Sequence, residues 1–194
     1  MNTVDIRINM GSEDIKHIIK RYHFREEDFL SLQALSGSMA PLLQVKAYYL
    51  WKSGDSLMSP KDYAAVFLTL GSGIDEMQEI YLSKNCLSEA YMIECIAIEM
   101  LYKSYGELIR EVQRQTGKWV EKMEFLGDTY PIELLPKLYR EFGQMDISYN
   151  EKFVLSPGKS VVFLLPMSDE KREGDCSLCE SCGNKTCILR LVTD

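Results

Sequence analysis

The sequence has few histidines, no long apolar run and a shortage of positive charge. Its two histidines, His17 and His23, both lie near the N-terminus, and no pattern brings a Ser or Cys nucleophile to them. The longest apolar candidate, 161–165, has the length of a strand, whereas a membrane-spanning helix needs roughly 20 apolar residues. These absences argue against a histidine-dependent hydrolase and against a membrane protein.

The charge balance is acidic, with 22 Lys and Arg against 29 Asp and Glu and a net charge of −7. Nucleic acids and anionic membrane surfaces attract clusters of Lys and Arg, so neither is an expected partner. Asp5 and Arg7 interrupt the N-terminal segment, so we expect no signal peptide. The protein is expected to be cytoplasmic, and cysteines in a reducing compartment are rarely paired as disulfides.

Hydrophobic spacing predicts one mixed α+β domain over residues 1–168, followed by a tail over 169–194. Gly71 and Gly73 come directly after an apolar run and are typical of a plain strand-to-helix turn, because Glu76 replaces the third glycine of a dinucleotide-binding loop. Helices are predicted over 13–22, over 26–51 with a break near 36–38, after Gly73 as far as Tyr81, over 88–115 and from Pro131 onward. Strands are predicted in the apolar part of 61–70 and over 119–125, 147–154 and 160–165.

The longest predicted helix has an apolar face with spacings near three and four residues. That face is expected to contain Leu87, Tyr91, Ala97, Leu101, Leu108 and Val112.

The tail contains four of the six cysteines within twelve residues, in the pattern C-x2-C-x2-C-x4-C. Thiolates two residues apart can turn toward one metal ion or cluster, because the backbone between them forms a tight loop. Gly183 and Asn184 in the last spacer suit the left-handed turn that would return the fourth cysteine. The sequence therefore predicts a metal centre held by Cys176, Cys179, Cys182 and Cys187.

The cysteine spacing favours a 4Fe–4S cluster, with zinc as the alternative. A consecutive C-x2-C-x2-C run is closer to iron–sulfur proteins, whereas zinc sites commonly use two C-x2-C pairs separated by a longer finger. Two alternatives remain. A reducing compartment argues against two disulfides, and the dense spacing of the cysteines argues against a flexible reduced tail. Cys86 and Cys95 lie in the helical region and are expected to be core residues.

Two regions before the tail contain motifs in a characteristic order. The first is VFLTLGSGID at 66–75, followed by AYMIE at 90–94 in the long helix. The second is FLGDTYPIEL at 125–134, leading to ISYNE at 147–151 and SPGKSV at 156–161. The order and spacing are similar to the activation domain of cobalamin-dependent methionine synthase. Its short stand-alone relatives often end in a cysteine cluster like the one here.

The resemblance implies a twisted antiparallel sheet flanked by helices. It also implies a role in the reductive reactivation of a corrinoid, in which S-adenosylmethionine is held close to cobalamin and a reduced cob(I)alamin takes the methyl group. The cobalamin would be carried by a partner, a corrinoid protein or corrinoid methyltransferase. Carried over by their motifs, the candidate residues lining a cofactor pocket are Gly127, Tyr130, Ser156, Pro157, Gly158, Lys159 and Ser160.

The family's S-adenosylmethionine motif is an Arg followed, after three residues, by Gly-Tyr, and this chain departs from it. Lys122 stands near the position of the Arg, and Gly127 and Tyr130 are present but not adjacent. Since a lysine cannot reproduce the bidentate grip of a guanidinium on a carboxylate, the departure argues against binding S-adenosylmethionine in that way.

The leading hypothesis is therefore an accessory protein for corrinoid-dependent methyl transfer, with a metal or iron–sulfur centre in the tail. One alternative is a non-catalytic scaffold or interaction protein in which zinc only folds the tail. The other is an S-adenosylmethionine-dependent methyltransferase.

Overall fold

The structure is a computed structural model and describes residues 1–54 and 61–170 of the 194-residue chain. Its α-helices are α1 (Ser12–Tyr22), α2 (Phe29–Met39), α3 (Gly73–Ser83), α4 (Leu87–Thr116) and α5 (Leu135–Phe142). Its strands are β1 (Asn2–Asp5), β2 (Lys46–Lys52), β3 (Tyr63–Thr69), β4 (Trp119–Val120), β5 (Glu124–Phe125), β6 (Ser148–Tyr149), β7 (Leu155–Ser156) and β8 (Ser160–Ser168). Short 3₁₀ helices span Glu26–Asp28, Ala40–Leu42 and Ile132–Leu134.

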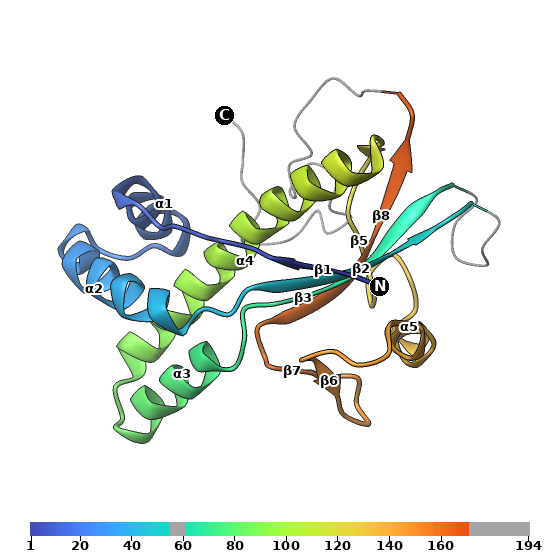
Figure 1. Ribbon diagram of the computed structural model, residues 1–194. Coiled ribbons are helices and arrows are strands. Elements are labelled where there is room, and N and C mark those ends of the chain that lie inside the picture. The colour runs from blue at the N-terminus through green and yellow to red at the C-terminus, as the bar shows by residue number, and fades with distance from the viewer. Residues whose placement is uncertain (55–60, 171–194) are drawn as a thin grey trace.

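One antiparallel sheet organises the fold, with strand order β1-β2-β3-β8-β4 and with β5 also pairing with β8. The strands β6 and β7 form a separate two-stranded sheet. Figure 1 shows α4 crossing one face of the main sheet, while α5 and the β6–β7 pair lie on the other. The predicted α+β class, an antiparallel sheet flanked by helices, is confirmed.

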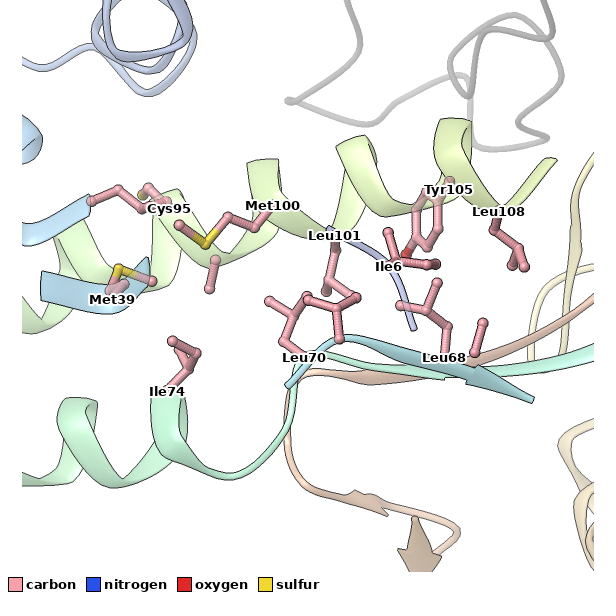
Figure 2. Packing of buried hydrophobic residues seen from close by; sticks show 14 of the residues in the cluster. Ile6, Met39, Leu68, Leu70, Ile74, Cys95, Met100, Leu101, Tyr105 and Leu108 are labelled. Atoms are coloured by element: carbon pink, nitrogen blue, oxygen red, sulfur yellow. The ribbon is translucent and has the colours of Figure 1, made fainter. Parts of the chain in front are cut away.

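Strand β3 lies at the centre of the sheet and is buried at every residue, as its continuous apolar run predicts. Because side chains alternate across a strand, Val66 and Leu68 enter the core on the α4 side, and Phe67 enters a second core with α5. Figure 2 shows the first core, in which Leu68 lies below Leu108 on α4. Each face of the sheet is therefore covered by its own set of helices.

Helix α4 matches the prediction in length, but its expected apolar face is wrong at the N-terminal end. Ala97, Leu101 and Leu108 are buried, whereas Leu87 is 65% exposed and Tyr91 is 53% exposed. The first turns of α4 extend beyond the sheet and pack beside α3, so that part of the helix has no strand beneath it (Figure 1). None of the helices in the described residues combines the length and apolar composition needed to cross a bilayer.

The predicted helix over 26–51 is wrong in its second half. Helix α2 ends at Met39, a 3₁₀ turn containing Pro41 follows, and the chain then forms β2 between β1 and β3. Aromatic residues such as Tyr48 and Tyr49 favour a strand once sheet neighbours cover them. Two other predicted strands are shorter than expected: 119–125 contains only β4 and β5, and 147–154 contains only β6.

A buried charged cluster attaches α1 to α4. The carboxylate of Glu99 on α4 lies 3.3 Å from Arg21 Nη1 and accepts a hydrogen bond of 3.0 Å from the Tyr22 hydroxyl. The Arg21 guanidinium also stacks 4.7 Å from the centre of the Tyr102 ring. Burial, together with the Glu99 charge, raises the pKa of the Tyr22 hydroxyl, so it stays protonated as a donor.

We expect Leu68→Ala to lower the free energy of unfolding by about 2–5 kcal/mol, because the substitution leaves a cavity in a fully buried part of the core. The matched control is Leu30→Ala on α2, where the side chain is 74% exposed and the change should stay within about 0.5 kcal/mol. Urea unfolding followed by circular dichroism measures both variants. Equal losses in the two variants would contradict this description of the core.

Candidate functional site

The turn between β3 and α3 brings three chain segments into close contact. Gly71 has a φ of +89°, and a Cβ atom there would lie 2.9 Å from the Cβ of Gln44. A Cβ at Gly73 would lie 2.8 Å from the carbonyl oxygen of Leu42. Glycine is needed at both positions because the segment entering β2 packs directly over the turn. The prediction of a strand-to-helix turn is confirmed.

A row of polar side chains crosses three strands at this end of the sheet. Lys46 on β2 pairs with Thr69 on β3, and Thr69 pairs with Ser160 on β8. The Ser160 hydroxyl donates a 2.8 Å hydrogen bond to Thr69 Oγ1, which also accepts from the Gly71 amide at 3.0 Å. The sequence motif that contains Ser160 and the glycine turn are thus joined through one threonine hydroxyl.

A small polar pocket of about 140 Å³ lies beside this row. Its charged lining is an ion pair between Lys46 Nζ and Asp146 Oδ2, 2.5 Å apart, and the Asp146 side chain is 66% exposed. The complete lining is Gln44, Lys46, Thr69, Gly71, Ser72, Asp146 and Pro157. Among the seven residues proposed from the sequence, Pro157 is the one that lines this pocket.

Asp146 is held in place by Tyr48 as well as by Lys46. The Tyr48 hydroxyl donates to Asp146 Oδ2 at 3.0 Å and accepts from the Asp146 amide at 3.3 Å. Hydrogen bonds from Lys46 and Tyr48 hold the pKa of Asp146 below its usual value, and the same contact raises the pKa of Lys46. The pocket therefore carries one carboxylate and one ammonium group at neutral pH.

Gly158 and Lys159, also proposed from the sequence, connect the β7–β8 loop to α3 and α4. The Gly158 amide donates to Asp75 Oδ2 at 2.5 Å. The Lys159 ammonium lies 2.7 Å from Glu94 Oε2 and 3.9 Å from Asp75 Oδ1. Ser156 precedes them, at the end of β7. These contacts fix the loop that carries Pro157 against the helices.

Gly127 and Tyr130 lie in a turn that follows β5. The Gly127 amide donates to the Tyr130 carbonyl oxygen at 2.7 Å, and the Tyr130 hydroxyl donates to Glu124 Oε2 at 2.8 Å. Lys122, near the position of the family's Arg, forms an ion pair with the other oxygen of Glu124. Burial and Glu124 raise the pKa of the Tyr130 hydroxyl. Lys122 and Tyr130 are both directed to a buried carboxylate of this chain.

The two segments proposed from the sequence both contact β8. The Leu126 amide donates to the Val162 carbonyl oxygen at 3.4 Å, two residues beyond Ser160. Since a strand advances about 3.3 Å per residue, the two contact points lie roughly 7 Å apart along β8. Whether Gly127 and Tyr130 line a cofactor pocket stays a prediction.

The predicted metal ligands Cys176, Cys179, Cys182 and Cys187 lie outside the described residues. Within residues 1–54 and 61–170, no group of three or more His, Cys, Asp or Glu side chains is arranged to hold a metal ion. Cys95 is buried in the α4 core, as predicted, and burial raises the pKa of its thiol to about 11. Cys86 is partly exposed at the N-cap of α4, so its predicted place in the core is wrong.

No family model and no curated protein match this sequence. Among solved structures, the chain is similar to one described as the crystal structure of the MetH reactivation domain bound to AdoHcy. The match covers 89% of this chain and 80% of that chain, with a TM-score of 0.52 and 12% sequence identity. The chain has the fold of the MetH reactivation domain. The fold expected from the sequence motifs is therefore confirmed.

Sequence reasoning missed Lys46 and Asp146, the charged pair of the pocket. Lys46 falls in the segment predicted as a helix, and Asp146 lies in a loop with no motif of its own. Their pairing joins residues 100 positions apart, so only the fold brings them together. Ala47 and Tyr49 pack into one core and the buried Tyr48 packs into the other, so β2 shows no alternation of polar and apolar residues that could have placed Lys46 beside Thr69.

We expect Gly71→Ala to lower the free energy of unfolding by about 1–3 kcal/mol, because a side chain is strained at this φ and contacts Gln44. The control is Gly106→Ala in α4, where an added Cβ has no neighbour within 4 Å. There the helix should gain about 0.5–1 kcal/mol. Thermal and urea unfolding of both variants measure the difference, and a stabilised Gly71→Ala variant would show that the turn is described incorrectly.

Proposed function

We propose that this protein is an accessory protein for corrinoid-dependent methyl transfer. The observation that carries the proposal is the likeness of its fold to the MetH reactivation domain over 89% of the chain. The motifs at 66–75, 125–134 and 156–161 support the same assignment, because the fold gathers all of them around the central strands β3 and β8. A corrinoid bound by the partner supplies the reactive cobalt, and this protein contributes docking and orientation.

The polar end of the sheet is the region that we assign to ligand binding. It combines a charged pocket with a loop fixed to two helices by the partly buried Lys159, whose side chain is 12% exposed. Such anchoring suits a binding site, because a site held by rigid elements orients its ligand better than a free loop does. Since the solved neighbour is described as bound to AdoHcy, an S-adenosyl compound is the ligand class that we propose for this protein.

We further propose that the four tail cysteines hold a 4Fe–4S cluster, with zinc as the alternative. Strand β8 ends at Ser168, and Cys176 follows eight positions later. A cluster there would be attached to a central strand of the domain. An iron–sulfur cluster in that place could pass an electron to a docked corrinoid, whereas zinc could only stabilise the docking surface.

Anaerobic purification followed by metal analysis and visible spectroscopy tests the metal proposal. We expect four iron and four sulfide per chain, in line with a 4Fe–4S cluster, and a brown colour that dithionite bleaches. Cys176→Ser and Cys182→Ser should lose most of the iron, whereas the control Cys86→Ser, outside the tail, should retain it. A content of one zinc per chain would refute the redox role, and a protein without metal would refute the metal site.

Corrinoid reactivation in solution tests the function itself. The full chain is mixed with a methionine synthase-type corrinoid protein in the cob(II)alamin state, titanium(III) citrate as the reductant and S-adenosylmethionine as the methyl donor. We expect the methylated corrinoid to form roughly tenfold faster, or more, than without the protein, because the protein orients the two reactants. The visible spectrum of the corrinoid follows the reaction.

A parallel sedimentation experiment should detect a complex between the two proteins. Bovine serum albumin at the same concentration controls for unspecific protein effects in both measurements. An unchanged rate together with no detectable complex would refute the accessory role.

A further inference from the structure

The pocket at the β3–α3 turn places a negative and a positive group side by side. Asp146 and Lys46 face each other across 2.5 Å, and both retain solvent contact, with side chains 66% and 35% exposed. A solvent-exposed ion pair of this kind contributes little to folding stability. A ligand with one positive and one negative group could therefore replace the contact within the pair at little cost in folding stability.

The carboxylate side of the pocket is already oriented. Tyr48 donates to Asp146 at 3.0 Å and accepts from its amide, so Asp146 keeps its position if Lys46 turns toward a ligand. Tyr48 itself is 5% exposed and is fixed by its place in β2. Asp146 thus offers a preorganised acceptor for an ammonium group.

The positive charge of the pocket comes from Lys46. The start of α3, whose N-cap residue Ser72 also lines the pocket, adds no net positive charge, because its first turn contains Asp75 and Glu76 and the Ser72 hydroxyl donates to Glu76 at 2.9 Å. Lys46 is therefore the pocket group that can receive a carboxylate.

The volume of the pocket limits what it can hold. At about 140 Å³ it is well below the roughly 300–1,000 Å³ of pockets that enclose whole small-molecule ligands. It has room for the amino-acid end of an S-adenosyl compound but not for the nucleoside.

We infer that this pocket binds the α-amino-acid group of an S-adenosyl ligand, with the α-ammonium on Asp146 and the α-carboxylate on Lys46. The inference rests on the proposed function for its ligand class and assigns the recognising residues. It also offers this chain a way to bind the ligand's carboxylate although Lys122, near the position of the family's Arg, is paired with Glu124. The nucleoside lies outside the pocket.

Isothermal titration calorimetry with two matched ligands tests this inference on the full chain. S-adenosylhomocysteine carries the amino-acid group, and 5′-methylthioadenosine has the same nucleoside thioether without it. We expect S-adenosylhomocysteine to bind roughly tenfold tighter or more, the usual effect of a hydrogen bond to a charged group. Asp146→Asn and Lys46→Met should each remove most of that advantage and leave the affinity for 5′-methylthioadenosine unchanged.

The ion pair between Lys16 and Glu13 on α1 provides matched controls. It is exposed, has an N–O distance of 2.7 Å and does not line the pocket. Lys16→Met and Glu13→Gln should therefore bind both ligands as the unmodified protein does. Thermal unfolding of all four variants verifies that each is folded.

Three results would overturn the inference: equal affinities for the two ligands, unchanged S-adenosylhomocysteine affinity in both pocket variants, or no binding of S-adenosylhomocysteine at millimolar concentration. Complex formation with the corrinoid protein is a separate measurement that does not depend on this pocket. An intact complex alongside any of these results would show that the pocket assignment has failed and that the docking role stands.

Discussion

The complete burial of β3 is the constraint on which the rest of the structure depends. Both faces of this strand are apolar from Tyr63 to Leu68, so the sheet must be covered on both sides. Helix α4 covers one face, and the shorter α5 with the β6–β7 pair covers the other (Figure 1). Neither layer alone could remove β3 from water, which ties the N-terminal and C-terminal halves of the domain together.

Polar groups reappear where β3 ends, and this transition creates the pocket. Thr69 is itself buried, yet its hydroxyl is satisfied by the Gly71 amide and the Ser160 hydroxyl. The chain then leaves the sheet through a turn so close to Gln44 that glycine is required. Lys46 follows directly in β2 and is thereby placed at the edge of the same turn. The close packing of the Gln44 segment against the turn therefore also positions the charged Lys46.

Charged contacts connect the helices to this framework in two places. Glu99 receives Arg21 and Tyr22 from α1, and Glu94 on the same helix receives Lys159 from the loop before β8. Glu99 is buried, and its contacts with a cation and a hydroxyl donor are the condition for keeping that charge away from water, whereas the Glu94 side chain is 35% exposed. Helix α4 is in this way both a layer of the core and the element to which α1 and the β7–β8 loop are attached.

The sequence by itself determined the elements whose signal is local: the apolar run of β3, the glycine turn after it, the length of α4 and the order of motifs that indicates the fold. It also contains the four-cysteine pattern of the tail, and metal binding by those cysteines stays a prediction. The tertiary structure alone decided that 46–52 forms a strand, because the short apolar run within it fits either a buried helix or a covered strand until β1 and β3 flank it. It alone decided that Lys46 meets Asp146, since contacts between residues 100 positions apart leave no periodic trace in the chain.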